Sequence, residues 1–283
     1  SWQADRVGPL LPGIVEMAWE TCRRTREAGV EKPIFVAPIV WKLRFRGAVH
    51  ETLRREMAHI ERRLDLQSGS RLTVEERLAV LQQNLLRRQW DRLELSPTPP
   101  ELDGVRYFTA QRTAVDAILR ELDRRYGPLE ADLARIQHAV RRSLRTQSDA
   151  DPLTVKRDRA LLAELSRLMG FAPELYDRPA LTQEQIAETL KRTRGMLLTR
   201  GRRDGMHNLI PIAAGPRDAF VRVPEPLAIH EAYSEEGGEE HRSALLRELR
   251  ERMQRSLDGL LEAIRPAVTR HARQNPLHTG AGR

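Results

Sequence analysis

The sequence predicts a mostly helical α/β protein, in which a long α-helical insertion interrupts a small sheet core. Two segments have the apolar, β-branched composition of strands, residues 32–45 and 219–223. Almost all of the chain between them repeats its apolar residues with the period of an α-helix. Charged residues make up 31% of the chain and aromatic residues 5%. This composition favours long amphipathic helices over a β-sandwich or barrel.

The N-terminal region, residues 1–49, is expected to form the first part of the sheet core. Irregular sequence with several Gly and Pro residues comes first, and a helix is expected from Gly13 to Ala28. Gly29 follows this helix directly, and Gly at that position commonly ends a helix.

The longest apolar segment, residues 32–45, predicts a strand buried on both faces. Pro38 lacks a backbone N–H, so a bulge or a strand end is expected there. Beyond Pro38, apolar and basic residues alternate, which predicts one buried and one solvated face. The apolar positions are Trp41, Leu43 and Phe45, and the basic positions are Lys42, Arg44 and Arg46.

Residues 50–205 are expected to form the helical insertion. From His50 onward, apolar residues recur three or four positions apart and make a series of helical stripes. Two of the expected helices begin with a capping box, in which a Thr and an acidic or amide side chain three residues later bond to each other's backbone. These boxes are Thr73–Glu76 and Thr182–Gln185.

Residues 206–265 are expected to return the chain to the core as its last strand and a C-terminal helix. Residues 219–223 have strand composition, and a regular leucine stripe between Leu245 and Ile264 predicts the helix. The polar tail, residues 266–283, contains Pro276 and two glycines, and is expected to be disordered.

Composition and motifs exclude several classes of function. Cys22 is the one cysteine, so neither a disulfide framework nor a Cys-based metal cluster is expected. No apolar run approaches the ~20 residues of a bilayer-spanning helix. The sequence contains no P-loop, no Rossmann fingerprint, no nucleophile elbow and no metal-ligand spacing of His and Asp.

Four stretches then follow one another along the chain in a distinctive order. The first is Asp5–Arg6–Val7 with Pro9 and Gly13, and the second is residues 36–40 with residues 42–45. The third is residues 171–190, and the fourth is residues 215–217 with residues 221–226.

Together these stretches resemble the 1-acyl-glycerol-3-phosphate acyltransferase family, in bacterial members with a long helical insert before the last strand. The first is similar to the segment after the family's Phe-Pro-Glu-Gly motif. The second resembles its Val-Pro-Val strand and Lys-Tyr-Arg-Tyr continuation, and the third the segment that closes the insert. The fourth resembles a Gly-Pro-Arg and Val-Arg-Val-Gly-Glu-Pro ending, in which Pro224 here replaces a Gly.

The resemblance implies a partial acyltransferase sheet core with a long helical insertion. It implies an enzyme of phospholipid biosynthesis that moves a fatty acyl group from acyl-CoA or acyl carrier protein to a lysophospholipid acceptor. No cofactor is implied, because the acyl carrier is a donor substrate. The expected location is cytoplasmic, on the inner face of the membrane as a peripheral protein, and no nucleic-acid partner is implied.

The family's catalytic motif, His-x-x-x-x-Asp, is not in this chain. None of the eight histidines has an Asp five positions on; His230 has Glu235 there, in a Gly-rich acidic loop. The Phe-Pro-Glu-Gly motif is also missing. We therefore expect the chain to be the C-terminal portion of an acyltransferase and to be inactive by itself; a degenerate, non-catalytic relative is the alternative.

The resemblance gives a set of candidate residues. Arg6, Lys42 and Arg44 are candidates for substrate binding, through contacts to phosphate or to a membrane surface. For the basic strand residues, an ordinary solvated strand edge is the alternative. Residues that match the family's structural motifs are Asp5, Pro9, Gly13, Pro38, Arg222 and Glu225.

Two other functions remain open at this point. A helical interaction protein would expose a large apolar patch on its insertion. An Arg-rich nucleic-acid binder would use the net charge of +8, with basic side chains clustered on one face. Arginines interleaved with glutamates, as in residues 247–252, speak against the second of these.

Overall fold

The computed structural model describes residues 5–8, 10–30, 32–66, 71–92, 104–129, 133–146, 151–169, 178–197, 215–234, 238–276 and 278. The chain divides into two compact units. The sheet unit comprises Ser1–Arg44 and Arg217–Val268, and the helical unit comprises Phe45–Pro216 and Thr269–Arg283.

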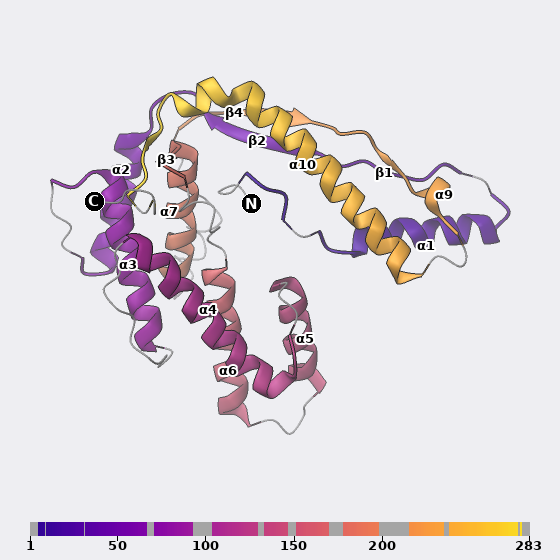
Figure 1. Cartoon of the computed structure of the whole chain (residues 1–283), viewed down its shortest axis with the longest axis horizontal. Coiled ribbons are helices and arrows are strands. Elements are labelled where there is room, and N and C mark those ends of the chain that lie inside the picture. Colours follow the sequence, from indigo (N-terminus) through magenta and orange to yellow (C-terminus); the bar gives the residue numbers. More distant parts are fainter. Residues whose placement is uncertain are drawn as a thin grey trace. The chain divides into compact units, whose positions relative to one another are not determined.

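The sheet unit is built on two small two-stranded sheets (Figure 1). Strand β1 pairs with β5 in antiparallel fashion, with Phe35 opposite Ala228 and Val36 opposite Leu227. Strand β2 is hydrogen-bonded to β4, so the two predicted strand segments lie side by side as expected. The elements of this unit are α1 (Gly13–Glu27), β1 (Phe35–Val36), β2 (Val40–Phe45), β4 (Arg217–Arg222), β5 (Leu227–Ala228), α9 (Ile229–Ala232) and α10 (Glu239–Thr269).

Helices α1 and α10 supply most of the apolar core of the sheet unit. Their buried side chains meet β1, β5 and α9, and Trp19 stacks at a tilt on Tyr233 with 4.9 Å between ring centroids. Cys22 is buried in the same core, and desolvation raises the pKa of its thiol, as expected for an inert cysteine. The buried members are Val15, Trp19, Cys22, Val36, Leu227, Ile229, Tyr233, Leu245 and Leu249.

The central segment differs from the single, doubly buried strand that its composition predicts. It forms two strands separated by residues 37–39, and Pro38 lies in this break, where a strand end was expected. Between Phe35 and Lys42 one face is buried: Val36, Pro38, Val40 and Lys42 point inward, whereas Phe35, Ile39 and Trp41 are more than half exposed. At the end of β2, Phe45 is buried, as expected. The expected solvated position of Lys42 is therefore wrong, because Lys42 shares the covered face and Trp41 does not.

The helical unit contains six helices among its described residues, together with one short sheet. Helix α2 packs against α3 and α7, and α4 packs against α6, with further contacts from α3 and α5 to α4. The elements are α2 (His50–Arg63), α3 (Val74–Arg92), α4 (Gly104–Tyr126), α5 (Leu133–Thr146), α6 (Pro152–Leu168), β3 (Ala180–Leu181), α7 (Gln183–Leu197) and β6 (Arg273–Gln274).

Two apolar clusters hold the helical unit together, and α3 contributes to both. One joins α3 to α4, α5 and α6, and the other joins α3 to α2 and α7. Both predicted capping boxes are present: the Thr73 and Glu76 pair bonds reciprocally, and Thr182 and Gln185 do the same. The predominance of helix predicted from the sequence is thus confirmed, and the sheets beside the helices are small.

The C-terminal segment departs from the expected disordered tail. Helix α10 includes Pro266 and runs to Thr269, and strand β6 then pairs with β3, with Ala180 opposite Gln274. Asn275, which is 2% exposed, donates from its backbone to Pro179 and from its side chain to Arg178. These contacts order the segment, although its polar composition gave no sign of them.

Several predictions fall outside the described residues. They are Pro9 and residues 171–177 of the third motif stretch. Within the described part of the chain, no helix combines the length and the apolar character needed to cross a bilayer.

Two glycine substitutions, one in each unit, test the packing inside that unit. An added Cβ at Gly215 would lie 2.9 Å from Val49 Cγ1, a buried side chain with little room to move. We expect Gly215→Ala to lower the free energy of unfolding by about 1–3 kcal/mol. Gly259 lies inside α10, where a Cβ meets only the far end of the long Arg222 side chain, which can shift by rotating about its own bonds. Gly259→Ala is therefore expected to raise stability by roughly 0.5–1 kcal/mol. Urea unfolding of both variants checks the opposite signs; two losses of equal size would contradict this packing.

Candidate functional site

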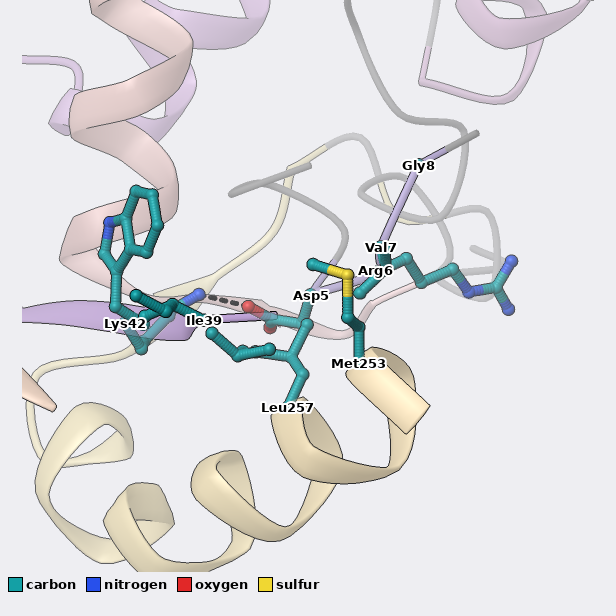
Figure 2. A pocket seen from close by; sticks show the side chains of 10 residues that line it. Asp5, Arg6, Val7, Gly8, Ile39, Lys42, Met253 and Leu257 are labelled. Atoms are coloured by element: carbon teal, nitrogen blue, oxygen red, sulfur yellow. Dashed lines mark hydrogen bonds and ion pairs between the residues drawn. The ribbon is translucent and has the colours of Figure 1, made fainter. Parts of the chain in front are cut away.

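The sheet unit contains a cavity of about 220 Å³ between the N-terminal loop, strand β2 and helix α10 (Figure 2). Its walls come from three segments that are far apart in the sequence. The lining residues are Asp5, Arg6, Val7, Gly8, Ile39, Val40, Trp41, Lys42, Met253 and Leu257. Three of the predicted site and motif residues, Asp5, Arg6 and Lys42, are thereby brought together.

An ion pair between Lys42 and Asp5 forms part of the cavity wall (Figure 2). The Lys42 side chain is 8% exposed and that of Asp5 is 15% exposed. Asp5 has a φ of +53°, a left-handed conformation that Asp tolerates better than most residues because its short side chain can bond locally. The loop therefore turns sharply at the residue that holds the buried ammonium.

Helix α10 fixes the backbone of this loop through two polar side chains. The backbone N–H of Val7 donates to Gln254 Oε1 at 2.8 Å, and Gln254 Nε2 donates to the carbonyl of Asp5 at 3.4 Å. Arg250 Nε donates to the carbonyl of Val7 at 3.3 Å. The loop is thus bonded to β2 through a side chain and to α10 through its backbone.

The same helix also holds the connection between β4 and β5. Arg252 donates to the carbonyl of Pro226 at 2.8 Å and to that of Glu225 at 3.3 Å. The Arg222 guanidinium lies over Gly259, where the missing side chain leaves space for it. Two of the motif residues, Arg222 and Glu225, therefore contact α10 and do not line the cavity.

Arg44, the third predicted substrate-binding residue, is placed differently. Its Nη2 lies 2.9 Å from Asp218 Oδ2, and its guanidinium lies 5.5 Å from the ring centroid of Phe220. It therefore links β2 to β4 and does not belong to the cavity wall. Gly13 begins α1 and Pro38 lies between β1 and β2, so both occupy structural positions.

His230 also has a structural contact. The backbone N–H of Ile34 donates to His230 Nδ1 at 3.1 Å. The ring therefore joins the residue before β1 to α9. Its sequence partner, Glu235, lies outside the described residues.

The chemistry of the lining suits binding better than bond making. None of the ten lining residues is a His, Ser, Thr or Cys, so the wall supplies no hydroxyl or thiol nucleophile and no imidazole base, and its Lys42 and Asp5 are paired with each other. Ile39, Trp41, Met253 and Leu257 offer apolar surface. Lys42 is paired with Asp5, so Arg6 gives the lining its net positive charge. An amphiphile with an anionic group fits this combination.

Sequence reasoning missed Gln254 and Arg250, which position the loop. Both lie on the flank of the leucine stripe of α10, and an isolated Gln or Arg there reads as an ordinary solvated residue. No local pattern identifies a partner 247 residues away.

The role of Gln254 can be tested directly. Gln254→Ala removes the acceptor of the Val7 N–H, and we expect the loop to open more often, with a loss of about 1–2 kcal/mol in local stability. Hydrogen exchange of the Val7 amide measures this opening. Arg255→Ala, an exposed residue of the same helix, is the control; equal exchange in both variants would show that Gln254 does not hold the loop.

Comparison with protein-family models, with curated proteins and with solved structures finds no match to this chain.

Proposed function

We propose that this chain is the C-terminal portion of a glycerophospholipid acyltransferase. The parent enzyme transfers a fatty acyl group from acyl-CoA or acyl carrier protein to a lysophospholipid acceptor, such as 1-acyl-glycerol 3-phosphate. In this proposal the enzyme works at the inner face of the membrane as a peripheral protein. The proposal rests on the resemblance of the motif stretches to that family.

One structural observation supports the proposal more than any other. Three of the motif residues, Asp5, Arg222 and Glu225, span 220 positions of sequence. They are held by strand β2 and helix α10, because Asp5 bonds to Lys42 of β2 and Arg222 and Glu225 contact α10. Residues that match one family in sequence order and also assemble in space are what a shared core would produce.

In this proposal the cavity receives part of the lipid acceptor or donor. The apolar wall of Ile39, Met253 and Leu257 would take hydrocarbon, and Arg6 at the exposed end would face the phosphate. The Asp5–Lys42 pair would hold the N-terminal loop, residues 5–8, against strand β2. The general base comes from the family's His-x-x-x-x-Asp motif, which these residues do not supply.

The two rival functions gain no support from the structure. In the described part of the helical unit, the large apolar side chains that are exposed are Leu153 and Met169, which do not amount to an apolar docking patch. Many arginines are occupied in ion pairs with carboxylates, for example Arg77 with Glu61 and Arg194 with Glu56.

An acyl-transfer assay tests the proposal. The protein translated from the complete reading frame that encodes this chain is incubated with lysophosphatidic acid and either acyl-CoA or acyl carrier protein loaded with a fatty acid. We expect phosphatidic acid to form, and we expect an Ala variant of the His in a His-x-x-x-x-Asp motif to abolish it. The 283-residue chain is the control and is expected to be inactive. Failure of the longer protein to acylate any lysophospholipid with either donor would refute the proposal.

A further inference from the structure

The C-terminal segment Arg270–Asn275, which we call the strap, docks onto strand β3 and the residues before it. Its strand β6 forms just two residue pairs with β3. Asn275 adds two hydrogen bonds to the backbone of residues 178 and 179. A two-residue strand pair near the end of the chain opens locally at a lower free energy than the core helices, so a single added charge can change its population.

His50, the first residue of α2, lies against the strap. Its ring is 6.5 Å from that of His271, and its side chain is hydrogen-bonded to the backbone of His271. The other ring nitrogen, Nε2, is buried and has no hydrogen-bond partner among the described residues. A second proton at Nε2 would therefore place a charge in a site that offers it no bond in the docked arrangement.

The charges around His50 divide by element. Desolvation lowers the pKa of His50 below its ordinary value of 6.5, and the charges of Arg273 and His271 on the strap lower it further, whereas the hydrogen bond to the His271 backbone raises it. Glu75 of α3 acts in the opposite direction and raises it; its Oε1 is likewise buried and unpartnered among the described residues. From α7, Gln183 bonds to the backbone of Gly47 and Val49, and Glu184 to that of Phe45.

We propose that the strap is a proton-operated clasp, in which protonation of His50 releases β6 from β3. The protonated ring is repelled by Arg273 and His271 of the strap and attracted by Glu75 of α3, so it exchanges its contact with the strap for one with α3. This inference does not depend on the proposed acyltransferase activity.

The direction of the pH dependence follows from the lowered pKa. Docking favours neutral His50, so docking is complete above the ordinary pKa of about 6.5 and weakens as the pH falls below it. One linked proton changes the ratio of released to docked strap by at most tenfold per pH unit. We therefore expect the released population to rise by up to roughly tenfold between pH 6.5 and pH 5.5.

Hydrogen exchange with mass spectrometry on the full 283-residue chain measures this release. The exchange rates are first corrected for the pH dependence of intrinsic amide exchange. The protection of residues 270–275 and 178–182 should then decrease as the pH is lowered, while that of α3 stays constant. His50→Asn keeps a donor for the His271 carbonyl and cannot be protonated, so it should remove the pH dependence. His59→Asn is the matched control, because His59 lies on the same helix and burial lowers its pKa too, but it has no described contact with the strap.

Arg273→Gln provides a second variant on the exposed side of the strap. It removes one of the charges that oppose protonation, so the loss of protection at low pH should become smaller than in the wild type. The clasp would be overturned by strap protection that does not change with pH, or by a pH dependence that persists in His50→Asn.

Discussion

Replacing Asp5 by Asn is expected to destabilise the sheet unit by about 3 kcal/mol. The substitution preserves the size of the side chain but removes its charge, and the Lys42 ammonium, whose side chain is 8% exposed, loses its paired carboxylate. Removing one partner of a buried pair costs far more than the pair contributes, because the remaining charge stays out of water. Urea unfolding followed by Trp19 and Trp41 fluorescence, in a background with Trp2→Phe and Trp90→Phe, reports on this unit.

Two further variants separate the effect of burial from that of charge alone. Asp5→Leu combined with Lys42→Met removes both charges and should recover most of the loss. Arg23→Gln breaks an ion pair with Glu20 on α1, whose side chains are 47% and 41% exposed, and should cost less than about 1 kcal/mol. If Asp5→Asn costs no more than Arg23→Gln, the Lys42–Asp5 pair is not a buried anchor of the loop.

The second large effect is expected in the helical unit, at Asp158. This side chain is fully buried, pairs with Arg125 and accepts a hydrogen bond from the Tyr126 hydroxyl at 2.5 Å. Asp158→Ala leaves both partners without that acceptor, and we expect a loss of about 3 kcal/mol in the free energy of unfolding. Asp116→Ala, at an exposed position of α4, should change stability by less than about 0.5 kcal/mol; a comparable loss there would point to a general effect of lowered charge.

The same cluster predicts a loss of stability at high pH. Desolvation, followed by the hydrogen bond to Asp158, raises the pKa of Tyr126 to about 12 from its ordinary value of 10. The stabilisation linked to the protonated hydroxyl is therefore present below pH 10 and is lost as the pH rises through 12. Tyr126→Phe should weaken the pH dependence of unfolding in that window.

The helices could be predicted well from sequence because their signals are local. Capping boxes at Thr73 and Thr182 mark helix starts through bonds that span three residues. The stripe of Leu53, Met57 and Ile60 in α2 is buried as its spacing requires. The pairing of β2 with β4 was also predictable, because each strand segment needs a partner for its backbone groups.

The faces of β2 could not be predicted, because alternation does not say which face another element covers. Trp41 and Lys42 occupy opposite faces as the pattern requires, yet the covered face is the one with the lysine. What reverses the ordinary preference is a carboxylate 37 residues earlier, on a loop turned by the left-handed backbone of Asp5. That partner leaves no mark in the strand's own sequence.

The candidate site could be predicted only in part, because some of its contacts join residues far apart in the sequence. Motif resemblance indicated Asp5, Arg6 and Lys42, which line one cavity, but it also suggested Arg44, which instead pairs with Asp218. The contribution of α10 depends on contacts across most of the chain, and the two-residue strands β3 and β6 are too short to have a pattern.

The adjacency of β2 and β4 is the central structural feature, since the resemblance to an acyltransferase core requires both strands in one sheet. Charge reversal at the contact between Arg44 and Asp218 tests it, with unfolding measured for Arg44→Asp, Asp218→Arg and the double variant. Each single variant places like charges at a contact of 2.9 Å, and the double variant restores the attraction. We predict a coupling free energy on the order of 1 kcal/mol, with the double variant more stable than either single one. Strictly additive losses would contradict the pairing of the two strands.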